Sequence, residues 1–209
     1  MTRIPKHIGI IPDGNRRWAQ GKGFAKEDGY AHGISPGLEL YHICRDLGVD
    51  ELTFYGFTVD NTKRPSRQRL AFSSACVKAV EALSHEDASL LVLGNTKSAM
   101  FPMELLPYTE RHTFGTGAVK INFLVNYSFE WDLGFHKGAM GPAMRSSDVS
   151  RVDLIIRWGG RRRLSGFLPV QSVYSDMYVI DDYWLILRPA MCMTPLTGTR
   201  NRISPWAGE

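Results

Sequence analysis

Short apolar runs alternate along the chain with stretches whose apolar residues recur at helical spacing. The runs are rich in β-branched or aromatic residues and have the length of buried strands. Predicted strands occupy residues 7–11, 51–57, 90–94, 118–125 and 152–156, followed by apolar segments at 170–174, 178–180 and 184–187. Predicted helices occupy residues 36–47 and 69–83, with a weaker one over 103–112 and another that opens at residues 16–19.

Continuous apolar strands that alternate with helices are typical of a parallel sheet covered on both faces. We therefore predict the α/β class, with a central, mostly parallel sheet flanked by helices. A chain of 209 residues suits one such domain, which we place at residues 1–188. Residues 189–209 contain prolines and glycines with little periodicity, so we expect a flexible tail or an arm that contacts a partner.

Composition and charge narrow the class of protein. The net charge of +4 suits a small anionic ligand and is too weak by itself to predict nucleic-acid binding. A hydrophobic fraction of 44% excludes disorder over most of the chain, and no apolar run reaches the roughly 18–20 residues of a membrane span. Three widely spaced cysteines without a C-x-x-C pair argue against a zinc cage or a disulfide scaffold. We therefore expect a cytoplasmic protein without stable membrane insertion.

Polar clusters follow several predicted strands, where ligands of parallel α/β sheets gather. The first cluster, residues 12–18, combines a glycine turn with the start of a helix, an arrangement that favours anions. Arg16 and Arg17 add positive charge, and Asp13 is able to hold Mg²⁺ against diphosphate oxygens. An N-capped helix with two solvated arginines explains this cluster equally well when it is taken alone.

Two further clusters contain amide and guanidinium groups. Residues 58–65 include Asn61, which could orient a proton acceptor, and Arg64, another donor for an anion; a solvated loop is the alternative. Residues 157–165 contain four arginines, a glycine pair and Ser165, which suit a diphosphate gripped by two guanidinium groups. A basic patch for RNA is the alternative here, and the small net charge disfavours it.

Asp176 forms a weaker fourth candidate, as a second carboxylate for the metal. Three other signatures are missing: the G-x-x-x-x-G-K-[ST] phosphate loop, G-x-G-x-x-G and H-E-x-x-H. ATP, dinucleotides and zinc proteolysis are therefore not expected. Apolar and aromatic walls for a substrate could come from Tyr55, Phe57, Trp158 and Phe167, although plain core packing is the more common use of such residues.

Taken in order, these segments resemble the cis-prenyltransferases, the undecaprenyl diphosphate synthase-like family. The likeness spans roughly residues 7–188 and is densest at residues 7–19, 57–65, 126–127 and 153–165, continuing through 167–184. It implies a twisted sheet flanked by helices and assembly as a homodimer. It also implies isoprenyl diphosphates as substrates and Mg²⁺ as cofactor.

The resemblance assigns roles to residues. It implies that Asp13 binds Mg²⁺, with Asp176 where the family has a metal-supporting glutamate, and that Asn61 handles the lost proton. Asp13, Arg17 and Asn61 are the expected catalytic residues. The allylic diphosphate is expected at Gly14, Asn15, Arg16, Arg17 and Lys26, the second diphosphate at Arg157, Arg163 and Ser165, and further substrate contacts at Trp18, Tyr30, Phe57 and Arg64.

Departures from the family pattern cluster in these motifs. Pro12, Arg16, Tyr30 and Thr62 replace residues of other types, and the usual final helix is absent from the expected elements. The pattern resembles a small branch that joins two dimethylallyl diphosphates head-to-middle into lavandulyl- or cyclolavandulyl-type diphosphates, and we favour the cyclised product. Short-chain elongation with isopentenyl diphosphate is the alternative, followed by a non-catalytic accessory subunit or a nucleic-acid module.

Overall fold

A computed structural model describes residues 4–134 and 144–198 and confirms the α/β prediction. Its described strands form one seven-stranded sheet in the order β4-β3-β5-β2-β1-β6-β7, in which only the β3–β4 pair is antiparallel. The strands are β1 (His7–Ile11), β2 (Glu51–Tyr55), β3 (Ala88–Leu93), β4 (His112–Thr113), β5 (Val119–Leu124), β6 (Leu154–Trp158) and β7 (Asp176–Ile180). The central position of β1 places the first polar cluster between those that follow β2 and β6.

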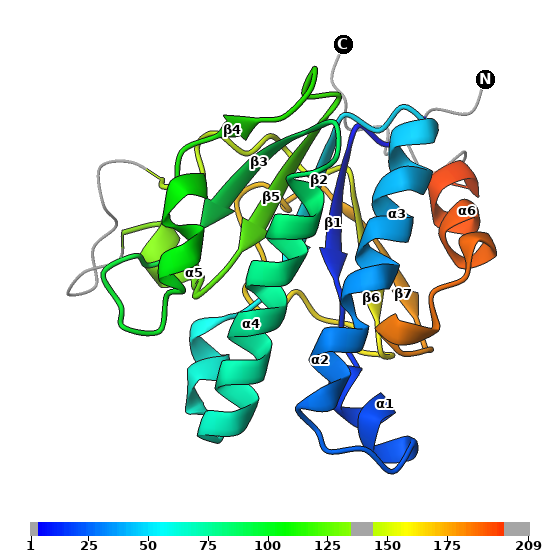
Figure 1. Cartoon of the computed structure of the whole chain (residues 1–209). Helices are drawn as coiled ribbons and strands as arrows, with labels where there is room; N and C mark the ends of the chain where they lie inside the picture. Colours follow the sequence, from blue (N-terminus) through cyan, green and yellow to red (C-terminus); the bar gives the residue numbers. More distant parts are fainter. Residues whose placement is uncertain (1–3, 135–143, 199–209) are drawn as a thin grey trace.

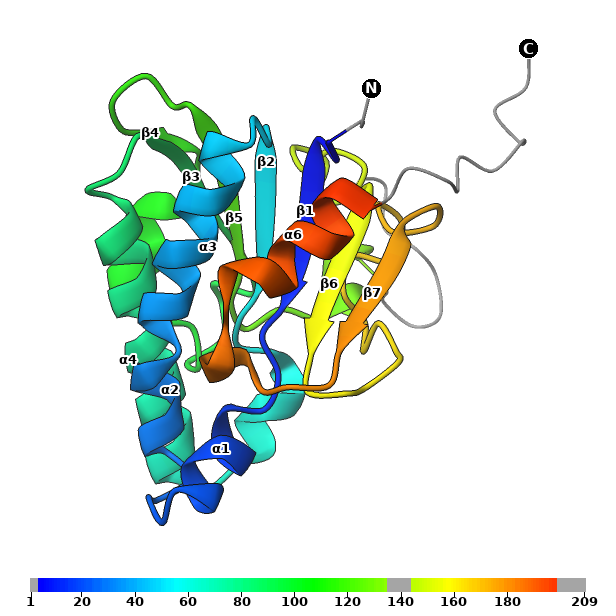
Figure 2. The ribbon, with the colours of Figure 1, turned by 90° about the vertical axis from the view of Figure 1, so that its right-hand side faces the viewer.

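Helices cover the two faces of the sheet unequally (Figures 1 and 2). The helices are α1 (Asn15–Gly21), α2 (Asp28–His32), α3 (Ile34–Asp46), α4 (Ser66–Leu83), α5 (Phe129–Asp132) and α6 (Pro189–Gly198), with 3-10 turns η1 (Val59–Lys63), η2 (Met103–Tyr108) and η3 (Trp184–Ile186). Buried residues of α3, α4 and α6 share one core layer with the sheet. The opposite layer is covered by the short α5 and by irregular segments.

Strand β1 shows how alternation builds these two layers. Ile8 and Ile10 point into the layer beneath α3 and α4, and Ile11 points into the opposite one, as the two-residue period of a strand requires. Gly9 lies under the ring of Phe167, where a Cβ atom would come within 2.6 Å of the ring. All five residues of β1 are buried, which explains the continuous apolar run in the sequence.

Local hydrogen bonding shifts some predicted boundaries. Strand β6 runs from Leu154 to Trp158, two residues later than predicted, and just before it the Asp153 carboxylate accepts hydrogen bonds from the backbone N–H groups of Lys6 and His7, at 2.7 and 3.0 Å. The weak helix predicted over 103–112 is instead the 3-10 turn η2 followed by β4. Pro107 inside η2 lacks the N–H that an α-helix would need there.

The prediction of a flexible tail from residue 189 onward is wrong for residues 189–198, which form α6. Cys192 and Leu196, one helical turn apart, are buried in the core layer that also contains residues of α3. Pro189 suits the first helical position because its fixed φ matches the helix and its missing N–H would have no partner there. The expectation for residues 199–209 lies outside the described part of the chain. Among the described helices, none combines the length and apolarity that crossing a bilayer requires.

A glycine at the carboxyl end of β3 allows a test of this packing. A Cβ atom on Gly94 would collide with the backbone carbonyl oxygen of Val125, just after β5. We expect Gly94→Ala to lower the free energy of unfolding by about 1–3 kcal/mol, as overpacking does, in urea denaturation followed by circular dichroism. Gly21→Ala is the matched control, because no heavy atom lies within 4 Å of that Cβ position. Equal stability of Gly94→Ala and the unmodified protein would contradict the placement of β3 against β5.

Candidate active site

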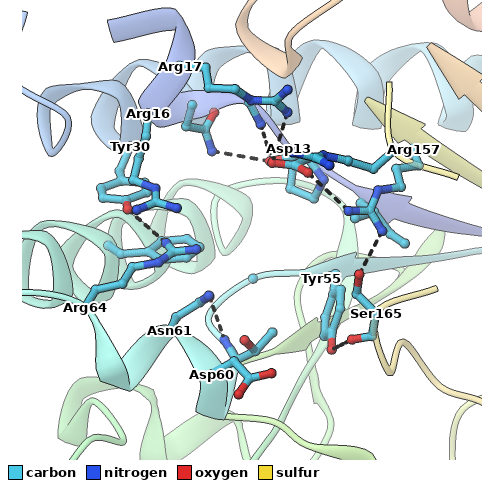
Figure 3. Close-up of a pocket in the computed structure, with 18 of the residues that line it drawn as sticks. Asp13, Arg16, Arg17, Tyr30, Tyr55, Asp60, Asn61, Arg64, Arg157 and Ser165 are labelled. Atoms are coloured by element: carbon cyan, nitrogen blue, oxygen red, sulfur yellow. Dashed lines mark hydrogen bonds and ion pairs between the residues drawn. The ribbon is translucent and has the colours of Figure 1, made fainter. Parts of the chain in front are cut away.

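The carboxyl ends of β1, β2 and β6 open into one crevice of about 500 Å³ (Figure 3). This is the edge where parallel sheets bind ligands. Most of the predicted site residues line this crevice: Asp13, Gly14, Asn15, Arg16, Arg17, Lys26, Tyr30, Asn61, Arg64, Arg157, Arg163 and Ser165. The fold therefore brings together three polar clusters that are far apart in the sequence.

The turn between β1 and α1 presents Asp13 to the crevice. Gly14 has a φ of 104°, a left-handed conformation that favours glycine, and a Cβ there would come within 2.6 Å of the Tyr183 ring. The Gly14 N–H donates to Asp13 Oδ1 at 2.7 Å, which fixes the carboxylate relative to the turn. The side chain of Asp13 is 37% exposed, so its carboxylate remains accessible from the crevice.

Arg157 connects the end of β6 to this turn. Its Nη2 donates to Asp13 Oδ2 at 3.1 Å, and its Nη1 donates to Ser165 Oγ at 3.0 Å and to the Arg163 carbonyl oxygen. The side chain is only 4% exposed, so the guanidinium is a buried cation that requires these partners. Its buried Nε has no hydrogen-bond partner within the described residues.

Arg17 lies on the other side of Asp13. Its Nη2 donates to the Gly159 carbonyl oxygen at 3.0 Å and lies 3.6 Å from Asp13 Oδ1, with the guanidinium over the ring of Tyr183. Gly159 has a φ of 82°, and a Cβ atom there would come within 2.6 Å of Arg17 Nη2. The glycine after β6 therefore permits the close approach of this arginine. We call Arg157, Arg163 and Ser165 the Arg157 side of the crevice.

Ser165 is held by an aromatic hydroxyl from the neighbouring strand. Tyr55 at the end of β2 donates to the Ser165 carbonyl oxygen at 2.7 Å. Ser165 adopts a φ of 56°, uncommon for a residue with a side chain, at the point where its Oγ meets Arg157. Burial is the main cause that raises the pKa of Tyr55, so this hydroxyl remains a neutral donor.

A second set of cations lines the opposite wall, and we call Arg16, Lys26 and Arg64 the Arg64 side. Arg64 Nη1 donates to the Tyr30 hydroxyl at 2.9 Å (Figure 3). Burial lowers the pKa of Arg64 and raises the pKa of Tyr30, although the neighbouring Arg64 charge partly opposes the latter shift. Arg16 donates to Gln68 at 3.3 Å, and Lys26 is exposed at the rim. The crevice thus has cationic groups on two facing walls.

Asn61 lies on the floor between these walls, in the 3-10 turn η1. Its Oδ1 accepts a hydrogen bond from the Thr58 N–H at 3.0 Å as part of a capping box. This bond fixes the amide, and within the described residues its Nδ2 group has no partner. A donor of this kind can orient a diphosphate oxygen or a water molecule.

Three predicted site residues do not line the crevice: Trp18, Phe57 and Asp176. Trp18 packs against Phe24 and His32, with ring centroids 6.1 and 5.1 Å apart, and does not line the crevice. Phe57 is buried, and its ring meets that of Phe72 edge-on at 5.4 Å. Proximity to a motif in sequence did not determine where these side chains point.

Asp176 also lies away from Asp13. It is the first residue of β7 and is in register with Leu154, the first residue of β6, whereas the crevice lies at the far end of β6. The first residues of parallel strands share the edge opposite their carboxyl ends, so this chain does not bring Asp176 to the carboxylate of Asp13. Of the other suggested wall residues, Trp158 and Phe167 are fully buried in the core, and Tyr55 lines the crevice.

Several crevice residues were missed by the sequence reasoning, among them Gln20, Asp60 and Phe72. Phe72 belongs to the apolar periodicity of α4, which is indistinguishable from ordinary core spacing. The Asp60 carboxylate lies 2.7 Å from Lys63 Nζ, three residues further along the chain, and both side chains are exposed. Asp60 lies in the predicted polar cluster 58–65, where Asn61 and Arg64 are the predicted site residues; no motif marks Gln20 or Phe72, which only the fold places at the crevice.

The donor set fits one kind of metal binding. Asp13 offers one accessible carboxylate, and no cluster of three or more histidine, cysteine, aspartate or glutamate residues occurs within residues 4–134 and 144–198. Mg²⁺ is commonly held by one or two carboxylates together with substrate phosphates, so Asp13 suits a magnesium ion shared with a diphosphate. Arginines on both walls match such polyanions, because guanidinium groups bind phosphate oxygens in pairs.

Comparisons with known proteins agree with this geometry. The family model described as "Putative undecaprenyl diphosphate synthase" matches residues 11–197. The ditrans,polycis-undecaprenyl-diphosphate synthase of Yersinia pseudotuberculosis is 29% identical over 87% of this chain and 82% of its own length. An isoprenyl transferase of Prochlorococcus marinus is 28% identical over 87% of this chain and 77% of its own length.

A solved structure shares the fold. The lavandulyl diphosphate synthase of Lavandula x intermedia, determined in complex with dimethylallyl diphosphate, matches with a TM-score of 0.77 at 18% identity, covering 95% of this chain and 96% of that one. The family match spans the β1–α1 turn, Asn61 and the Arg157 loop, which form the crevice. The chain therefore belongs to the cis-prenyltransferase family, the undecaprenyl diphosphate synthase-like prenyltransferases.

Proposed function

We propose that this protein condenses two molecules of dimethylallyl diphosphate head-to-middle, releases one diphosphate, and cyclises the branched ten-carbon product to cyclolavandulyl diphosphate. The observation that carries the proposal is the pair of facing cationic walls in one crevice of about 500 Å³. Two diphosphates need several donors each, and the two walls supply them on either side of Asp13. The structural likeness to a lavandulyl diphosphate synthase supports this branch.

Each substrate has a proposed place. The diphosphate that leaves lies at Asp13 with Arg16 and Arg17, and Lys26 closes the rim. The second diphosphate lies against Arg157, Arg163 and Ser165, where Arg157 is already oriented by Ser165 Oγ. Mg²⁺ bound by Asp13 and phosphate oxygens would supply further electrostatic stabilisation of the departing group.

The reaction then follows from charge and proximity. The bond between the allylic carbon and its diphosphate breaks, the electron pair leaves with the diphosphate, and Arg16 and Arg17 stabilise that charge. The double bond of the second molecule attacks the cation-like carbon, because both headgroups hold their tails in one crevice. A proton is then lost; Asn61 orients the acceptor, for which the released diphosphate is available. For the cyclic product, the remaining double bond attacks the coupled carbocation before any proton is lost, which closes the ring and moves the positive charge to a ring carbon, and the proton then leaves this cyclic cation; the tails must remain shielded from water until this step.

The alternative is elongation of an allylic diphosphate with isopentenyl diphosphate. The activity for which the undecaprenyl-diphosphate synthases among the relatives are named favours it, and the same two walls would serve its two diphosphates. Homodimer assembly stays a prediction from the resemblance, and cytoplasmic location and the absence of a nucleic-acid partner stay predictions from cysteine usage and net charge.

Product analysis separates these functions. Purified protein is incubated with dimethylallyl diphosphate and Mg²⁺ alone, and the products are dephosphorylated and identified by gas chromatography and mass spectrometry. We expect a cyclic ten-carbon alcohol, because the proposed reaction takes dimethylallyl diphosphate at both walls and closes the ring before the product leaves. Linear cis products that form only when isopentenyl diphosphate is added would establish elongation instead. Salt-sensitive RNA retention without turnover of either substrate would establish a binding module.

Replacement of one carboxylate tests the proposed metal position. Asp13→Asn keeps an oxygen that can accept the hydrogen bond from Arg157 and removes the negative charge. We expect kcat/KM for dimethylallyl diphosphate to fall by about 100-fold or more, with the Mg²⁺ concentration for half-maximal rate increased. Asp46→Ala, at an exposed aspartate of α3, is the control and should retain full activity. Full turnover by folded Asp13→Asn would show that this carboxylate does not bind the metal.

A further inference from the structure

The segment that follows β7 packs behind the turns that form the crevice. The Trp184 N–H donates to the Asp13 carbonyl oxygen at 3.1 Å, and the Gly159 N–H donates to the Asp182 carbonyl oxygen at 2.9 Å. One bond thus reaches the turn after β1, and the other reaches the turn after β6. We call residues 181–184 the Tyr183 segment; none of its side chains lines the crevice. The segment therefore supports the site from outside it.

The ring of Tyr183 contacts the first of these turns. A Cβ atom on Gly14 would come within 2.6 Å of this ring, and the guanidinium carbon of Arg17 lies over the ring, 5.0 Å from its centroid. That distance is within the range of a cation–π contact. Among the residues that the structure describes, the Tyr183 hydroxyl has no hydrogen-bond partner, so Arg17 meets the face of the ring and not a polar group.

Arg17 has few other restraints. Its side chain is 40% exposed, and within residues 4–134 and 144–198 its guanidinium makes one hydrogen bond, to the Gly159 carbonyl oxygen at 3.0 Å. The carboxylate of Asp13 restrains it weakly, because Arg17 Nη2 lies 3.6 Å from Oδ1, beyond hydrogen-bond length. Both carboxylate oxygens already accept hydrogen bonds, one from a backbone N–H and the other from Arg157. The Tyr183 ring is therefore a main restraint on where this cation lies.

We propose that Tyr183 is a positioning residue, whose ring holds the Arg17 guanidinium in place for a diphosphate bound next to Asp13. Arg17 lines the crevice and points toward Asp13 (Figure 3). A guanidinium has five N–H donors, so those not used by Gly159 remain available to phosphate oxygens while the ring stays in contact. A cation that is ordered before binding costs the ligand less free energy to engage. The inference rests on the proposed function only in taking a diphosphate as the ligand at Asp13.

Binding of the headgroup alone tests this role. Inorganic diphosphate is titrated calorimetrically into the full-length protein in the presence of Mg²⁺. We expect Tyr183→Leu, which removes the ring face, to weaken the affinity by about three- to tenfold, and Tyr183→Phe, which keeps it, to stay within about twofold of the unmodified protein. Tyr108→Leu is the matched control and should keep the original affinity, because this half-buried tyrosine of η2 contacts His112 and Phe114.

A double-mutant cycle separates positioning from packing. Arg17→Met keeps an apolar stem and removes the guanidinium, so we expect Tyr183→Leu to cause less than about 1.5-fold further loss of affinity in the Arg17→Met protein. If the ring acted only by packing against Gly14, the loss would be the same in both backgrounds, which would overturn the proposal. Tyr183→Met, with a flexible side chain that adapts to irregular packing, is the second variant and should give the same loss as Tyr183→Leu.

Other outcomes also contradict the proposed positioning. An unchanged affinity in folded Tyr183→Leu and Tyr183→Met would overturn it, with folding checked by thermal denaturation. A loss in Tyr183→Phe as large as that in Tyr183→Leu would overturn it as well, because the ring face is then not what matters. Failure of the unmodified protein to bind diphosphate would remove the headgroup site and the positioning role together.

The binding assay also separates this inference from the proposed reaction. A loss of diphosphate affinity in Tyr183→Leu that disappears in the Arg17→Met background supports the positioning role even where product analysis finds elongation with isopentenyl diphosphate. A cyclic ten-carbon product together with an unchanged affinity in Tyr183→Leu supports the reaction and rejects the positioning role. Each idea can therefore fail alone.

Discussion

The crevice depends on one ion pair between residues that are far apart in sequence. Arg157 is in register with Ile11 on the adjacent strand, and two residues beyond Ile11 the chain turns to present Asp13. Because the Arg157 guanidinium is buried, removal of the carboxylate would leave a desolvated cation, so the two strand ends are held at a fixed separation. That separation orients the Arg157 donors toward Ser165 at the wall of the crevice.

Much of the fold and part of the site could be predicted from the sequence. The features that could be predicted are those set by local hydrophobic periodicity, and the features that could not depend on tertiary contacts. β1 matches its predicted range because every residue in it is buried, whereas β6 continues past its predicted end through Arg157 and Trp158, whose pairing with β7 no periodicity reveals. Two buried residues of α6, Cys192 and Leu196, are too few to reveal a helical periodicity in the sequence. They pack in the same core layer as buried residues of α3. Asp176 follows an apolar segment in sequence yet begins its strand, and only the observed strand register places it at the wrong edge.

Arg64 connects the anion site to the stacked rings of Tyr30 and Phe72. It lies over the rings of Tyr30 and Phe72, and its hydrogen-bond partner there is a neutral phenol. Burial lowers its pKa, and no carboxylate lies within ion-pair distance of it in the described part of the chain. A bound diphosphate would supply the missing negative charge and stabilise the charged form of this buried guanidinium.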